Sequence, residues 1–195
     1  MNIYLIIILL IIAGDFILGL VVDSLNMRNV STVLPEEFAG WYDAERYRKS
    51  QDYLKENTRF RLLVDTITTP ITVAFILLGG FNLVDLAARS FELGSIPTGL
   101  IFAGMLMLAS QLLSIIPSIY STFVIEEKYG FNRTTPKTFI LDILKGWLLT
   151  LFIGGAIFSC ILWFFEQTGV FAWIYCWLAV VIFQLIITYL APVVI

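Results

Sequence analysis

The side chains able to do chemistry are few in this chain, and many of them gather between Phe123 and Gly146. This stretch carries two adjacent carboxylates, a Gly-Phe-Asn tripeptide, and an acid and a base three residues apart: Glu126, Glu127, Gly130, Phe131, Asn132, Asp142 and Lys145. Carboxylates and a lysine can form ion pairs, and an asparagine amide can cap or bridge a turn. From the residues alone we therefore expect a helix-loop-helix corner fastened by caps and ion pairs.

The local order of residues supports this corner. Gly130 can supply the left-handed residue that ends a helix, and Phe131 can fold back onto apolar surface. Thr134 or Thr135 suits the N-cap of the next helix, and Pro136 suits its first position.

The sequence contains no histidine. A His-ligated zinc site, a Ser-His triad and a histidine general base are therefore excluded within these 195 residues. Cys160 and Cys176 lie in apolar runs without a metal-binding neighbour, so we expect buried structural thiols. We accordingly expect neither a catalytic residue nor a cofactor in this chain by itself.

Composition indicates a membrane protein. Hydrophobic residues make up 59% and charged residues 14% of the chain, against about 25% charged in an ordinary soluble domain. Apolar runs of this length predict membrane-spanning helices rather than barrel strands. We predict an all-α polytopic membrane protein, with five spans over residues 3–22, 62–86, 97–125, 138–165 and 170–195.

The connection over residues 23–61 is long, polar and expected to be partly helical. Opposite charges four residues apart, interleaved with aromatic side chains, are typical of a helix at the level of the lipid headgroups. Acids balance the bases here, so nucleic acid is not expected as a partner. Eleven of the twelve Lys and Arg residues lie in or beside the first and third connections. The positive-inside rule then predicts a cytoplasmic C-terminus and a lumenal or external N-terminus.

Asp15, Gln111 and Gln184 are three of the polar side chains within the predicted spans. Asp15 either lines a chamber, or lies near the cytoplasmic end of its span within reach of Arg28 or Lys49. Gln111 and Gln184 are expected to form hydrogen bonds between helices, with lining of a chamber as the alternative.

The segment "PSIYSTFVIEEKYGFNRTTPKTFILDILKG" resembles the signature of the CAAX prenyl protease family, integral-membrane zinc metalloproteases that process farnesylated proteins, with prokaryotic relatives. The residues that carry the resemblance are Pro117, Tyr120, Phe123, Ile125, Glu126, Glu127, Gly130, Phe131, Asn132, Thr134 or Thr135, Phe139, Asp142 and Lys145. The upstream "YDAERYRKSQDYLKENTRF" and the order of the spans are similar too.

The resemblance implies a helical chamber of seven spans, with a zinc-binding HExxH segment after the fifth span. Residues 1–195 are then expected to be a single N-terminal transmembrane domain, with the catalytic metallopeptidase domain and its zinc following residue 195. No catalytic residue carries over, because the chain has no histidine. The corner is then expected to be a structural joint that packs on the catalytic domain. Alternatively, Glu126 or Glu127 forms an ion pair with a basic residue of that domain.

The resulting hypothesis is the N-terminal region of a membrane-embedded zinc metalloendopeptidase, catalytically inert alone. Expected partners are the lipid bilayer, the C-terminal domain and prenylated or membrane-protein substrates. The location is the endoplasmic reticulum in a eukaryote, or the plasma or inner membrane in a prokaryote. The alternative is a non-catalytic membrane scaffold or a small transporter or channel subunit. A transporter predicts paired ionisable residues at mid-depth, and only Asp15 fits.

Overall fold

The structure, a computed structural model, describes residues 2–194 and contains no strand within them. Five helical segments are long and apolar enough to cross a membrane: Ile3–Asn29, Ala44–Leu77, Ser95–Glu126, Pro136–Thr168 and Ala172–Tyr189. The predicted all-α membrane architecture is confirmed. Ile195, the last residue of the fifth predicted span, lies outside the described residues.

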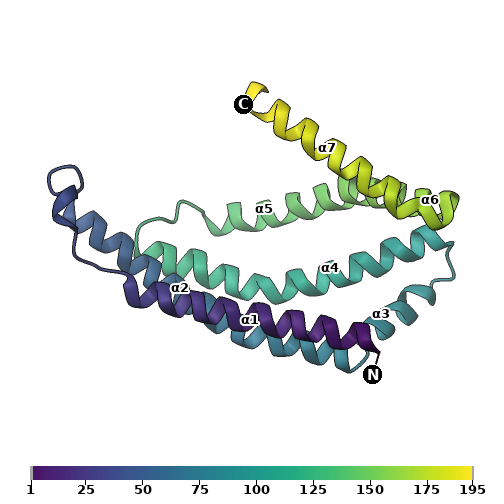
Figure 1. Ribbon diagram of the computed structural model, residues 1–195, viewed down its shortest axis with the longest axis horizontal. Coiled ribbons are helices and arrows are strands. Elements are labelled where there is room, and N and C mark those ends of the chain that lie inside the picture. The colour runs from purple at the N-terminus through teal and green to yellow at the C-terminus, as the bar shows by residue number, and fades with distance from the viewer. Residues whose placement is uncertain (1, 195) are drawn as a thin grey trace. The chain divides into compact units, whose positions relative to one another are not determined.

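The chain folds into two compact units, and each is best described by itself. The first unit comprises Met1–Val84 and Leu106–Thr135. Within it α1 (Ile3–Asn29) packs along α2 (Ala44–Leu77), as Figure 1 shows. An ion pair of 2.6 Å between Arg61 and Asp23 joins the two helices.

The polar segment is partly helical, as predicted: its residues from Ala44 onward form one continuous helix, α2, with the second span, and the 3-10 turn η1 (Glu36–Phe38) precedes this helix. The carboxylate of Asp43 caps α2 by accepting a hydrogen bond from the backbone N–H of Arg46 at 2.9 Å. Gly79, with φ +76°, adopts the left-handed conformation that ends a helix. The last residues of the predicted span 62–86 therefore lie in the separate helix α3 (Gly80–Arg89).

The third membrane segment changes its helical geometry near its end. Helix α4 (Ser95–Tyr120) continues into the π-helical turn η2 (Ser121–Glu126), which packs against α2. Tyr120 lies on Phe60 of α2, with ring centroids 4.7 Å apart. Ile125 in η2 is fully buried.

The second unit comprises Asp85–Met105 and the residues from Pro136 onward. Helices α5 (Pro136–Leu149) and α6 (Gly155–Thr168) are joined without a break by the π-helical turn η3 (Thr150–Gly154). The 3-10 turn η4 (Gly169–Phe171) then reverses the chain into α7 (Ala172–Val194), which packs on α6.

Most large apolar side chains of both units are exposed. Among the described side chains only Thr58, Ala88, Ile125 and Ala172 are buried. A soluble protein could not leave so much apolar surface in water, whereas a bilayer solvates it. The chain is an integral multi-pass membrane protein.

Candidate functional site

The Gly-Phe-Asn segment forms a closed corner directly after η2. Gly130 has φ +69°, a conformation that costs other residues energy. The Gly130 turn lets the backbone N–H groups of Phe131 and Asn132 donate to the carbonyl of Glu126, at 2.8 and 3.2 Å. Helix α5 then begins at Pro136, the predicted first helical position.

The side chain of Asn132 holds both sides of this corner. Its amide nitrogen donates to the Glu127 carboxylate at 2.9 Å, and its amide oxygen accepts from the backbone N–H of Thr134 at 2.6 Å. Asn132 thus connects the end of η2 to the residues that lead into α5.

A carboxylate on α2 anchors the corner from the opposite side. One oxygen of Glu56 accepts hydrogen bonds from Lys128 Nζ at 2.6 Å and from the Tyr129 hydroxyl at 2.7 Å. The ring of Tyr53, three residues earlier on α2, lies 5.6 Å from the ring of Tyr129 and 4.8 Å from that of Phe131. Both aromatic contacts are edge-on, the arrangement that ring quadrupoles favour.

The Glu56 carboxylate also sets the protonation of its two donors. The hydrogen bond to Glu56 raises the pKa of Lys128 and raises the pKa of Tyr129, because the protonated form of each group is the one that donates. Both groups therefore keep their protons throughout the physiological range.

The corner keeps one carboxylate without a partner. No described residue forms a hydrogen bond or ion pair with the carboxylate of Glu126, although its backbone carbonyl is used twice. Glu126 is partly buried, and Phe131 keeps 49% of its surface exposed although one side contacts Tyr53 of α2. The corner therefore has one carboxylate and part of one aromatic ring available for a further contact.

Asp142 and Lys145, in the second unit, share a face of α5 as predicted. Their charged atoms are 3.8 Å apart, with 62% and 70% of the side chains exposed. A pair this exposed contributes little to stability.

The three polar residues of the spans lie on α1, α4 and α7. Asp15 is exposed on α1, and no ion pair joins it to Arg28 or Lys49 within the described chain. Gln111 is half-buried and Gln184 is exposed, and neither amide has a hydrogen-bond partner in residues 2–194.

Sequence reasoning missed Tyr53, Glu56 and Tyr129. The mixture of aromatic and charged side chains over residues 41–61 marked the right helix, but nothing local pointed to a partner more than seventy positions away. It also missed Asp23, which pairs with Arg61, and Asp65, a second exposed carboxylate within a membrane segment.

The described residues contain no group of three or more acidic or cysteine side chains arranged to hold a metal ion. Cys160 and Cys176 are both free thiols, but the expectation that they are buried is wrong: Cys160 is exposed and Cys176 is partly exposed, since apolar helices of a membrane protein turn side chains toward lipid. The donor set of residues 2–194 therefore does not fit a zinc site.

Comparison with known proteins places this architecture in a family. A family profile described as the CAAX prenyl protease N-terminal region, with five membrane helices, matches residues 23–195. The chain belongs to this family, and the match is to the family's N-terminal region of five membrane helices.

Comparisons with individual proteins agree with this family assignment. The chain is 32% identical over 189 residues to the probable CAAX prenyl protease 1 of Schizosaccharomyces pombe, covering 86% of this chain and 39% of that protein. It is 29% identical over 174 residues to the human CAAX prenyl protease 1 homolog, covering 83% of this chain and 37% of that one. The crystal structure of S. mikatae Ste24p superposes with a TM-score of 0.84 at 25% identity, over 100% of this chain and 47% of that one. The chain thus spans about two fifths of the length of the curated relatives it matches.

Proposed function

We propose that this chain forms the membrane part of a zinc metalloendopeptidase, and that the HExxH segment and its zinc belong to a domain beyond these 195 residues. Two observations support the proposal. The family profile covers the N-terminal region of CAAX prenyl proteases, and the residues described hold no metal-binding group. In such a segment the glutamate would activate a zinc-bound water against the peptide bond.

The observation that carries the proposal is the geometry of the corner. Glu56 and Tyr53 hold it from the α2 side, while the Glu126 carboxylate has no charged partner among the described residues and Phe131 stays half-exposed. An unpaired carboxylate beside an exposed aromatic ring suits the edge of a protein interface. We assign Glu126 to a basic residue of the catalytic domain, with Glu127 and Asn132 supporting the turn.

The distribution of basic residues supports one orientation of the chain in the membrane. Eleven of the twelve Lys and Arg residues lie in or beside the two connections on one face, and the positive-inside rule assigns that face to the cytoplasm. The corner and the catalytic domain would share this face, where a prenylated protein substrate is available. Asp15, Gln111 and Gln184 would then be candidates for the lining of the chamber that admits the substrate.

The test uses the complete protein, purified from membranes and assayed for cleavage of a farnesylated peptide that ends in a CAAX sequence. We expect about one zinc per molecule and cleavage that a chelator abolishes. We expect Glu126→Gln to lower kcat/KM by about tenfold, the equivalent of one lost charge-assisted contact.

Glu36→Gln is the matched control, because Glu36 is an exposed acid in the turn η1, away from the corner. Activity should be unchanged in this variant. A complete protein that contains no zinc, or that leaves the farnesylated peptide intact, would contradict the proposed activity. Equal activity of Glu126→Gln and the wild type would contradict the docking role alone.

A further inference from the structure

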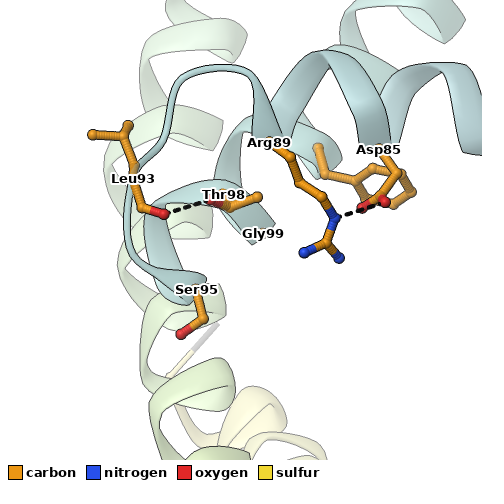
Figure 2. Close-up of a pocket in the computed structure, with 7 residues that line it drawn as sticks. Asp85, Arg89, Leu93, Ser95, Thr98 and Gly99 are labelled. Atoms are coloured by element: carbon orange, nitrogen blue, oxygen red, sulfur yellow. Dashed lines mark hydrogen bonds and ion pairs between the residues drawn. The ribbon is translucent and has the colours of Figure 1, made fainter.

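A cavity of about 490 Å³ lies within the second unit, between α3 and the start of α4. Figure 2 shows its walls, which combine an ion pair with small polar and apolar side chains. The lining residues outside the ion pair are Leu93, Ser95, Thr98, Gly99 and Phe102. No residue of the candidate site contributes to it.

The wall formed by α4 is fixed by two contacts with α6. A Cβ atom on Gly99 would lie 2.7 Å from Cδ1 of Leu162, so any larger residue there would require the end of the Leu162 side chain to shift. One turn earlier on α4, the Ser95 hydroxyl donates to the carboxylate of Glu166, one turn later on α6. On the α3 side the Thr98 hydroxyl donates to the Leu93 carbonyl at 3.1 Å and holds the connecting turn (Figure 2). These contacts hold the helices and the turn that surround the cavity.

The charges around the cavity are unequal. Arg89 Nε donates to Asp85 at 2.7 Å, and its two terminal nitrogens point away from that carboxylate (Figure 2). These nitrogens have no other partner in the part of the chain that the structure describes. Glu166, which accepts from the lining residue Ser95, and Glu92 in the connecting turn add two carboxylates beside the cavity, although neither lines it. The ligand that fits these surroundings best accepts hydrogen bonds from Arg89 and carries no net negative charge.

Aromatic side chains place the cavity at the depth of the headgroups. Phe91, Trp163, Trp173 and Tyr175, all of the second unit, are between 52% and 63% exposed near the end where α4 begins and α6 passes into α7. Exposed tryptophan and tyrosine at the ends of membrane helices mark the boundary between hydrocarbon and water. The cavity therefore opens where lipid phosphates lie.

We propose that this cavity binds the headgroup of a phospholipid with a primary ammonium, of the phosphatidylethanolamine type. The terminal nitrogens of Arg89 would donate to the phosphate, and the ammonium would donate to the Glu166 carboxylate. A quaternary ammonium cannot donate hydrogen bonds and is recognised instead by several aromatic rings, whereas Phe102 is the one aromatic side chain that lines the cavity. Anionic headgroups would add negative charge beside three carboxylates.

The test is native mass spectrometry of the complete protein in detergent, counting retained lipids. The probes are phosphatidylethanolamine, phosphatidylcholine and phosphatidylglycerol with identical acyl chains, and soluble phosphorylethanolamine as the source of headgroup without lipid. We expect preferential retention of phosphatidylethanolamine. Arg89→Gln should lower it at least fivefold, while Arg89→Lys should keep part of it. Glu166→Gln should retain the Ser95 hydrogen bond, since its amide oxygen still accepts, but should bind ethanolamine and choline lipids equally.

Arg46→Gln is the matched control, since Arg46 is an exposed arginine at the start of α2, in the other unit. Retention should be unchanged in this variant. The proposal is overturned if Arg89→Gln retains as much phosphatidylethanolamine as the wild type does. It is equally overturned if phosphatidylglycerol is preferred, or if phosphorylethanolamine alone binds as tightly as the lipid, since the site would then recognise a soluble phosphate ester.

Discussion

At the scale of single residues, the corner depends on one carboxylate oxygen that accepts two hydrogen bonds. Lys128 and Tyr129 both donate to the same oxygen of Glu56, from positions adjacent in the chain. The tyrosine bond is lost when the phenol is deprotonated, and the lysine contact loses its charge when the ammonium becomes a neutral amine, so the anchor of the corner weakens on the alkaline side.

We expect this anchor to weaken above about pH 10, where lysine and tyrosine titrate in an unfolded chain. Both groups have a raised pKa in the folded protein. Their contribution to the free energy of unfolding is therefore complete below the unfolded pKa and is lost as the pH rises through the folded one. Thermal unfolding in detergent should show a gap in Tm between the wild type and Glu56→Gln that narrows between about pH 9.5 and 11.5. A gap of constant size across this range would argue against the two hydrogen bonds.

Gly130 is the residue whose backbone the corner depends on most. An alanine there would have to adopt φ +69°, which costs about 1–2 kcal/mol. The new methyl group meets only the Lys49 amine, at an ordinary contact distance of 3.5 Å, so the cost arises in the backbone. We expect Gly130→Ala to lower Tm by several degrees in a thermal unfolding scan.

Gly146→Ala provides the comparison for this substitution. Gly146 lies inside α5 with ordinary backbone angles, and nothing lies within 4 Å of the added methyl group. Alanine there should leave Tm unchanged or raise it slightly, because it is the better helix former. If both variants lose stability equally, the left-handed turn is not the cause.

At the scale of elements, hydropathy and the residues that begin or end helices predicted most of the architecture. The five apolar runs, the start of α5 at Pro136 and the shared face of Asp142 and Lys145 follow from local patterns. The anchor on Glu56 could not be predicted, because a hydrogen bond between residues so distant in the chain leaves no local pattern. For the same reason the sequence did not predict the close approach of Gly99 to Leu162, where glycine leaves room for the leucine side chain.

Gly99 therefore offers a test of the packing between α4 and α6. We expect Gly99→Leu to destabilise the protein by about 1–3 kcal/mol, the usual cost of overpacking, as measured by thermal unfolding. Gly104→Leu on the same helix should be nearly neutral, because nothing lies within 4 Å of a side chain there. The double variant Gly99→Leu with Leu162→Ala should recover part of the loss. A single variant as stable as the wild type would show that the two helices do not approach as described.

At the scale of the whole molecule, the membrane replaces the buried core. The exposed apolar surface makes sense only in lipid, and the uneven distribution of basic residues then predicts which connections face the cytoplasm. The orientation can be measured without reference to activity.

For that measurement, Cys160 and Cys176 are first replaced by alanine, and a single cysteine is introduced at an exposed loop position. In sealed cells, a maleimide that cannot cross membranes should label Arg133→Cys only after permeabilisation. In a bacterial host it should label Glu92→Cys directly, since this turn lies on the opposite face. The reverse pattern would invert the proposed orientation.

The π-helical turn η2 decides where the chain can change its length just before the corner. A widened turn accommodates an additional residue within a continuous helix. Deleting one residue from Ser121–Glu126 would remove that additional residue and leave the corner on the same side of the helix. Deleting one residue from the preceding α-helical turn of α4 would instead rotate the corner by about 100° about the helix axis. The donors of the corner would then face away from Glu56 even though each of them was still present.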